Sequence, residues 1–251
     1  MCILTFFKPG VPVDVDALAA GAVANPHGHG YAVVAEDHIR TGHDLDPAQV
    51  ITEFTDLRAK YPHTPALFHS RWATHGQITI DNCHPFAVGG DERTVLAHNG
   101  ILPALVQPRP GDLRSDTRIA AEDFLPAQPF GPPDSWVGRS GLEQWLRSDK
   151  MVLLTVDPAY RHRAYVFNEH RGHYSDTGVW YSNTSYQSLL YRHPDDDGYC
   201  YGCGEYDPEL FGPHCSYCGF CAECFHTFPH CECPAAPGVE RYADLEEYLA
   251  A

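Results

Sequence analysis

A cysteine is the second residue of this chain, which begins MCILTFF. Because Met1 precedes a small residue, removal of the initiator methionine would leave Cys2 as the amino terminus. The pKa of an α-amino group is about 7.7 to 8.0, so part of the population is neutral at cellular pH and can accept the thiol proton. Cys2 would then supply both a nucleophile and its base. The alternative is a buried thiol at the start of a strand, which an isolated cysteine at this position would favour.

Four polar motifs follow Cys2 in order along the chain. They are HSRWATHG at 69–76, NCHPF at 82–86, LAHNGIL at 96–102 and SDT at 115–117. Together with the cysteine they closely resemble the class II glutamine amidotransferases, over about residues 2–186. The resemblance implies an α+β fold, the four-layer αββα sandwich of N-terminal-nucleophile hydrolases. It also implies hydrolysis of L-glutamine to glutamate and ammonia through a Cys2 thioester.

The resemblance further implies an oxyanion hole made by Asn99 and Gly100. Amide hydrolysis through a thioester needs hydrogen-bond donors aimed at the oxygen that becomes negative in the tetrahedral intermediate. Asn99 offers a side-chain amide, and Gly100 offers a backbone N–H that no side chain obstructs. An Asn-Gly pair is also a strong turn signal, and a turn would expose both donors.

Glutamine recognition requires partners for the α-carboxylate and the α-ammonium group. The planar guanidinium of Arg71 can hold the carboxylate, and Asp116 can pair with the ammonium. Taken singly, both would more often be surface charges, and only the shared pattern favours the binding roles. By resemblance the same pocket is lined by Trp72, Thr74, His75, His84 and the Gly100 carbonyl.

Two positions depart from the family pattern. Ile3 follows the nucleophile where glycine is frequent, which allows the first strand to sit slightly differently but removes no catalytic group. His27 replaces the acidic residue of an Asn-Pro-acidic-Gly stretch found in some members. We interpret His27 and His29 as loop histidines, with a role in the pocket as the alternative. We interpret Cys83 as a buried thiol.

Eight of the ten cysteines lie near the C-terminus. Their spacing is C-x2-C, eleven residues, C-x2-C-x2-C-x2-C, six residues, then C-x-C, and it comprises Cys200, Cys203, Cys215, Cys218, Cys221, Cys224, Cys231 and Cys233. Glycine follows CYGC and CSYC, as in zinc knuckles. Eight thiolates satisfy two closed, tetrahedral structural zinc ions, so the spacing predicts two zinc ions with the ligand pairing left open.

An iron–sulfur cluster is the less favoured alternative for these cysteines. Cys215 to Cys224 resemble a ferredoxin run, but two residues rather than three precede the last cysteine. His214, His226 and His230 could substitute for a thiolate. A segment of about 40 residues has too little core to fold alone, so the metal would supply its stability.

Strand-like and helix-like runs alternate before this tail. Strands are predicted over 2–7, 30–35, 65–72, 94–100, 151–156, 163–167 and 178–186. Helical periodicity places Val15, Leu18, Ala22 and Val23 on one face of 14–25, and Val50, Ile51, Phe54, Leu57 and Tyr61 on one face of 47–61. A short helix is predicted near Ser115, within an otherwise Pro-rich stretch. Several of the polar motifs fall at strand ends, where function often lies.

The domain organisation follows from a change of composition at the acidic HPDDDG stretch. We predict a glutamine amidotransferase type 2 domain over 2–192, a Cys-rich zinc-binding module over 198–235 and a C-terminal helix over 238–251. That helix would carry Val239, Tyr242, Leu245 and Leu249 at helical spacing.

Charge and hydropathy exclude several classes of protein. A formal net charge of -16 opposes a broad electrostatic grip on nucleic acid. No apolar run reaches the roughly 18 to 20 residues of a membrane span, and no export signal precedes Cys2. Clustered cysteines without such a signal indicate metal ligation in a reducing cytoplasm. We therefore expect a cytoplasmic protein.

Nothing left in 251 residues is large enough to be a synthase, so a separate synthase or acceptor-binding partner is expected to receive the ammonia. One alternative is a hydrolase of another amide, but Arg71 with Asp116 suits both ends of an amino acid. The other is a catalytically silent, zinc-dependent adaptor. The intact Cys2, Asn99, Gly100 and Asp116 count against it.

Overall fold

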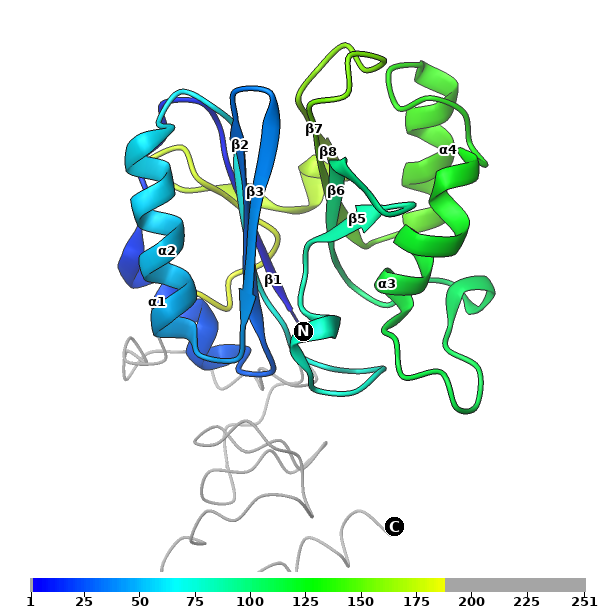
Figure 1. Cartoon of the computed structure of the whole chain (residues 1–251), viewed down its shortest axis with the longest axis horizontal. Helices are drawn as coiled ribbons and strands as arrows, with labels where there is room; N and C mark the ends of the chain where they lie inside the picture. Colours follow the sequence, from blue (N-terminus) through cyan, green and yellow to red (C-terminus); the bar gives the residue numbers. More distant parts are fainter. Residues whose placement is uncertain (1, 188–251) are drawn as a thin grey trace, which may run out of the picture. The chain divides into compact units, whose positions relative to one another are not determined.

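The structure, a computed structural model, describes residues 2–187 and arranges them in four layers. Two antiparallel sheets face each other, and helices cover the outer side of each (Figure 1). The predicted α+β class and the αββα layering are therefore confirmed for this part of the chain. The predicted zinc module, the C-terminal helix and the domain boundary after residue 192 lie outside the described residues.

The first sheet places the start of the chain in its interior. Its order is β3 (His38–Asp44), β2 (His29–Ala35), β4 (Ala66–Ser70), β1 (Ile3–Phe7), β10 (Trp180–Tyr181) and β9 (His173–Tyr174). Antiparallel pairing sets Ile3 opposite Ser70. Cys2, one residue before β1, is thereby brought to the end of β4, where Arg71 and Trp72 follow.

The second sheet carries Asn99 at the end of one of its strands. Its order is β5 (Phe86–Val88), β6 (Asp91–Asn99), β7 (Lys150–Thr155) and β8 (Ala164–Phe167). Asn99 is the last residue of β6 and pairs with Lys150. The Asn99–Gly100 turn therefore leaves the sheet at a fixed point.

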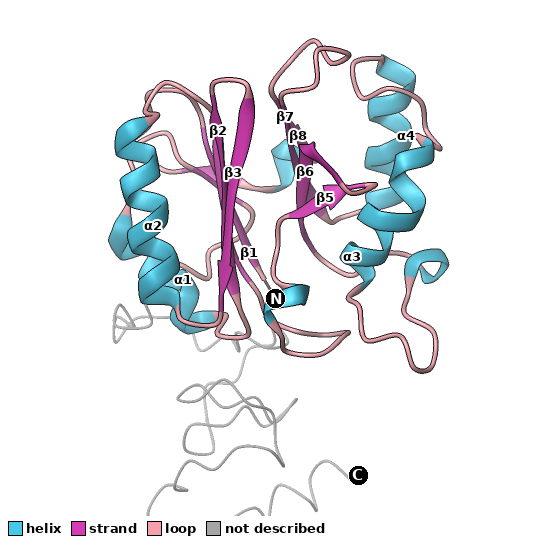
Figure 2. Cartoon of the chain, in the orientation of Figure 1, coloured by secondary structure: helices cyan, strands magenta, loops and turns pink. Residues whose placement is uncertain are grey.

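The helices cover the two outer faces (Figure 2). α1 (Val15–Ala24) and α2 (Pro47–Lys60) pack on the first sheet, and α3 (Asp116–Ile119) and α4 (Trp136–Leu146) lie on the second. The carboxylates of Asp14 and Asp46 and the hydroxyl of Ser135 cap α1, α2 and α4 by accepting backbone N–H groups of the first turn. Short turns complete this part of the chain at Ile80–Asn82, Ala104–Val106, Ala120–Phe124, Leu125–Ala127 and Glu169–Arg171.

Every residue of β1 is buried because the strand is covered on both faces. Leu4 and Phe6 pack between the sheets, whereas Ile3 and Phe7 pack under the helices. This explains why CILTFF is apolar except for Thr5, since a strand buried on both faces does not alternate apolar and polar residues. Burial on both faces fixes the position of Cys2.

Helix α1 buries a different face from the predicted one. Val15 and Val23 are 43% and 65% exposed, whereas Leu18 and Ala22 are buried as expected. Gly21 lies so close to Ile3 that a Cβ on it would be 3.2 Å from the Ile3 Cγ2. The small residues therefore face the sheet at short range, which turns the two valines outward.

Several elements were not predicted from the sequence. Strand β3 has no buried residue and lacks an apolar pattern, β5 has three residues, and α4 follows the Pro-rich stretch directly. The predicted strand over 178–186 is reduced to β10. Among the described residues, no helix combines the length and apolarity that a membrane crossing requires.

Candidate active site

The Cys2 thiol is held by the segment that follows β4. Its Sγ accepts a hydrogen bond from the Trp72 backbone N–H at 3.3 Å and lies 3.4 Å from the Trp72 carbonyl oxygen. The Cys2 carbonyl accepts a hydrogen bond from Asn183 Nδ2 at 2.7 Å. Burial raises the pKa of the Cys2 thiol, and the Trp72 N–H offsets only part of that effect. A thiol in this environment needs a base to become a nucleophile.

Cys2 and every residue predicted to bind substrate line one small cavity. The lining consists of Cys2, Arg71, Trp72, Thr74, His75, His84, His98, Gly100, Ser115, Asp116 and Thr117. Three of these, His98, Ser115 and Thr117, were not among the predicted site residues. The sequence offered a signal for them, because His98 precedes Asn99 in LAHNGIL, and Ser115 and Thr117 flank Asp116 in SDT.

Asn99 lies next to this lining without being part of it. The side chain is buried, and its Nδ2 donates a hydrogen bond to Ser182 Oγ at 2.6 Å. Gly100, the adjacent residue, does line the cavity. The two predicted oxyanion donors therefore sit at the end of β6, beside the chain segment that carries Cys2.

Position 100 requires a glycine. Its φ of +146° is rarely adopted by other residues, and a Cβ added to it would lie 2.0 Å from the Asp149 Cγ. Asp149 in turn pairs with His98, whose Nε2 lies 3.3 Å from the carboxylate. The turn after β6 is thus packed against a side chain that leaves no room for a substituent.

Arg71 organises the loop that forms one wall of the cavity. Its Nη1 donates to the Gln77 carbonyl at 2.9 Å and its Nη2 to the His75 carbonyl at 2.6 Å. Burial lowers the pKa of Arg71, but a guanidinium remains charged in proteins. The cavity therefore contains a cation that is shared with backbone carbonyls.

Asp116 joins the turn after Gly100 to helix α3. One carboxylate oxygen accepts the Leu102 N–H at 2.8 Å, and the other accepts the Thr117 N–H at 2.7 Å. The residue is 6% exposed. Its position lets one carboxylate contribute negative charge to the cavity and also hold two backbone segments together.

His84 has two ring nitrogens without a hydrogen-bond partner although the side chain is buried. Its ring lies 3.9 Å from the His69 ring, measured between centroids. Burial lowers the pKa of His84 well below its usual value, so the ring is neutral near pH 7. An unpartnered, neutral imidazole in a polar cavity is suited to bind a ligand group.

Three nearby residues, His27, His29 and Cys83, are not part of the cavity lining. His27 Nδ1 accepts the Ala73 N–H at 3.0 Å, and its ring packs against Trp72. His29 is not a loop residue as predicted: it begins β2, is 1% exposed and bonds Ser70 Oγ. The reason is that β2 pairs with β4 from its first residue. Cys83 is a buried thiol, as predicted, and burial raises its pKa to about 11.

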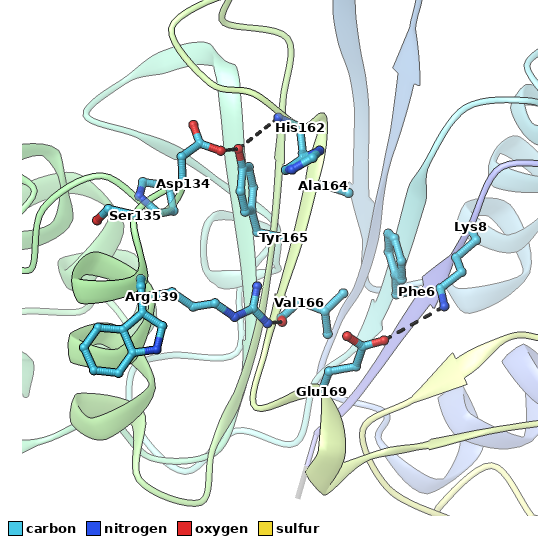
Figure 3. Close-up of a pocket in the computed structure, with 12 residues that line it drawn as sticks. Phe6, Lys8, Asp134, Ser135, Arg139, His162, Ala164, Tyr165, Val166 and Glu169 are labelled. Carbon is cyan, nitrogen blue, oxygen red and sulfur yellow. Dashed lines mark hydrogen bonds and ion pairs between the residues drawn. The ribbon is translucent and has the colours of Figure 1, made fainter.

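A larger groove lies elsewhere and contains none of the predicted site residues (Figure 3). Its volume is about 570 Å³, and its charged side chains include Lys8, Arg139 and Glu169. Lys8 pairs with Glu169, and Arg139 donates to the Val166 carbonyl. These charged groups already have partners within the protein, so the size of the groove does not make it the better candidate site.

Within residues 2–187 no cluster of three or more His, Cys, Asp or Glu side chains could hold a metal ion. The eight cysteines predicted to bind zinc, from Cys200 to Cys233, all lie outside the described residues.

Comparison with known proteins gives one family match and several partial relatives. A family described as "Glutamine amidotransferases class-II" matches residues 11–124. Glutamine–fructose-6-phosphate aminotransferase [isomerizing] of Streptococcus pyogenes serotype M6 is 32% identical over 93 residues, which are 33% of this chain and 15% of that enzyme. The same enzyme of serotype M3 is 43% identical over 108 residues, 41% of this chain and 16% of that enzyme.

The chain thus spans less than a fifth of the length of these relatives. Among solved structures, glutamine phosphoribosylpyrophosphate amidotransferase of B. subtilis has a TM-score of 0.45 and 16% identity, over 74% of this chain and 42% of that chain. The matched segment, 11–124, contains all four polar motifs that follow Cys2. Residues 11–124 of this chain are therefore similar to the class II glutamine amidotransferases.

Proposed function

We propose that this chain hydrolyses L-glutamine to glutamate and ammonia through a thioester on Cys2. The observation that carries the proposal is the single cavity that Cys2 shares with Arg71, His84 and Asp116. The α-amino group of Cys2, freed by removal of Met1, takes the thiol proton as Sγ attacks the side-chain carbonyl carbon of glutamine. Burial, which keeps the thiol protonated, makes this base necessary.

The remaining steps use the donors at the end of β6. The oxyanion of the tetrahedral intermediate accepts hydrogen bonds from Asn99 Nδ2 and the Gly100 N–H. As the C–N bond breaks, the protonated α-amino group of Cys2 gives its proton to the leaving nitrogen, which departs as ammonia. Water then attacks the thioester, its proton returns to the thiol by way of the α-amino group, and glutamate is released.

Recognition of glutamine is assigned to the two charges in the cavity. Arg71 would pair with the α-carboxylate and Asp116 with the α-ammonium. The cavity volume of about 10 Å³ has room for roughly one water molecule. We propose that the loop after Trp72 moves to admit glutamine, and that the substrate carboxylate then takes over guanidinium donors now bonded to His75 and Gln77.

We infer that the ammonia acceptor lies on a partner protein. The matched relatives are named for both glutamine and fructose 6-phosphate, so in them the ammonia from glutamine has an acceptor. Large apolar side chains on the segments that form the cavity are 47% to 72% exposed: Ile78, Ile80, Ile101, Leu105 and Leu113. We propose that these side chains contact the partner protein, and that this contact keeps ammonia from water.

The proposal is tested by assaying the purified chain for release of glutamate and ammonia, alone and with the proteins that copurify with it. Glutamate release by the chain alone, with ammonia incorporated into a product only in the presence of a partner, is the expected result. A chain that hydrolyses other amides but not glutamine would overturn the assignment of substrate.

Separate kinetic effects are expected for recognition and for chemistry. Asp116→Asn should raise KM for glutamine by about tenfold or more, because it removes a charge-assisted partner of the ammonium. Asn99→Ala should lower kcat by about 10² to 10³-fold, because it removes an oxyanion donor. Steady-state kinetics of both variants measure this. If both substitutions changed KM alone, Asn99 would not be an oxyanion donor.

Thermal unfolding is the control for Asp116→Asn. Since both carboxylate oxygens of Asp116 accept backbone N–H groups, the variant is also expected to unfold at a lower temperature. Kinetics measured well below that temperature separate the binding role from the structural one.

For the cysteines outside the described residues we propose two structural zinc ions in a reducing cytoplasm. The support is the spacing of Cys200 to Cys233, which provides eight thiolates. Elemental analysis should find close to two zinc ions and little iron per chain. Chelation, or truncation near Asp197, should leave basal glutamine hydrolysis in place, because the cavity residues all precede residue 118. A brown protein with stoichiometric iron would refute the zinc assignment.

A further inference from the structure

We propose that Ser182 is a positioning residue that sets the side-chain amide of Asn99 relative to the Cys2 strand. The inference rests on the proposed function and deepens it, because it names the group that orients the assigned oxyanion donor. Ser182 is 1% exposed and follows β10, far in sequence from both residues that it connects.

The Ser182 hydroxyl joins the two sheets at one oxygen. Its Oγ accepts the Leu4 backbone N–H at 2.9 Å and a hydrogen bond from Asn99 Nδ2 at 2.6 Å. The Ser182 backbone N–H donates to the Leu4 carbonyl at 2.9 Å, so the residue is anchored to β1 by two bonds. Leu4 is two residues from Cys2, and Asn99 ends β6 of the other sheet.

In this geometry the two N–H groups of the Asn99 amide have different partners. Nδ2 carries two N–H groups, and the bond to Ser182 uses one of them. That bond restricts rotation of the amide about its last side-chain torsion, which is otherwise broad. The second N–H is then held in one direction and is available to an oxyanion. A hydroxyl attached to the nucleophile's own strand therefore couples the position of the donor to that of the thiol.

The neighbouring residue strengthens the same attachment. Asn183 Nδ2 donates to the Cys2 carbonyl at 2.7 Å, while Asn183 Oδ1 accepts the Ser185 N–H at 3.0 Å. Successive residues, Ser182 and Asn183, thus hold Asn99, Leu4 and Cys2. The short β10 and the turn after it therefore connect the nucleophile Cys2 to the oxyanion donor Asn99.

A double-mutant cycle on kcat tests this role against a merely structural one. Wild type, Ser182→Ala, Asn99→Ala and the double variant are assayed for glutamine hydrolysis. If Ser182 acts through Asn99, Ser182→Ala should lower kcat by about tenfold or more and change KM less than about twofold. In the Asn99→Ala background the same substitution should then have almost no effect.

The control is a buried hydroxyl away from the cavity. Thr155 is 1% exposed, and its Oγ1 bonds Thr94 Oγ1 at 2.8 Å. Thr155→Ala loses a comparable hydrogen bond and should leave kcat and KM near the wild-type values. Ser182→Cys keeps the side-chain volume but replaces the hydroxyl by a weaker acceptor, and it gives a second measurement of the cycle where the alanine variant does not fold.

Two results would overturn the inference. Ser182→Ala could leave kcat unchanged, or it could lower kcat by the same factor with and without the Asn99 side chain. Failure of the wild-type chain to hydrolyse glutamine would instead refute the proposed function, so the two failures are distinguishable.

Discussion

Replacement of Cys2 by alanine is expected to lower glutamine hydrolysis by at least about 10³-fold, because the variant has no atom that can form the thioester. The fold should persist, since the Cys2 backbone contacts do not involve sulfur: the carbonyl still accepts from Asn183, and β1 still pairs with β4. Ammonia release and thermal unfolding, measured on the same preparation, check both parts.

Cys83→Ala is the matched control for this prediction. Cys2 and Cys83 are the free thiols among the described residues, and Cys83 is absent from the cavity lining. Its removal should leave hydrolysis within a few fold of wild type. Intact-mass spectrometry of the active protein should show that Met1 is missing. Full activity of Cys2→Ala, or loss of activity only in Cys83→Ala, would refute Cys2 as the nucleophile.

The second large effect is expected for Gly100→Ala, which should lower kcat/KM by about 10²-fold or more. The added methyl group would lie 2.0 Å from Asp149 Cγ, so the turn after β6 must shift. A shift of the turn moves the Gly100 N–H and the adjacent Asn99 amide together. Steady-state kinetics and thermal unfolding of the variant measure the effect on activity and on stability.

Two variants separate crowding from backbone strain at this position. Gly90 also has a positive φ, of +77°, but an added Cβ would meet no atom within 4 Å. Gly90→Ala should therefore show the cost of strain alone and retain activity. Combining Gly100→Ala with Asp149→Ala removes the steric contact and should recover part of the lost activity. Equal losses in Gly90→Ala and Gly100→Ala would show that Asp149 is not the cause.

The residues of the site could be predicted from the sequence because they are grouped in short motifs. Arg71 and Trp72 follow one buried strand, and Asn99 ends another and is followed by Gly100, so each pair is positioned by local structure. Their order after Cys2 indicated the resemblance to the family and a set of residues that the structure brings to one cavity. Helix α2 was predictable for a similar reason, since its apolar residues repeat at helical spacing over four turns.

Contacts between distant segments could be found only in the tertiary structure. Ser182 binds Leu4 and Asn99 across 178 and 83 residues, and no local pattern marks it as a partner of either. The burial of Gly21 rather than Val15 and Val23 depends on how closely α1 approaches β1. His29 is a strand residue because β4 pairs with it.

Motif spacing and side-chain periodicity are local properties of the chain, so they indicate which chemical groups this protein has and in which motifs they occur. How those groups face one another depends on long-range contacts: Cys2 lies against Trp72, Asp149 fills the space beside Gly100, and the Ser182 hydroxyl connects Asn99 to β1. The physical reason is that such positions are set by packing between two sheets, which joins residues that no local interaction relates.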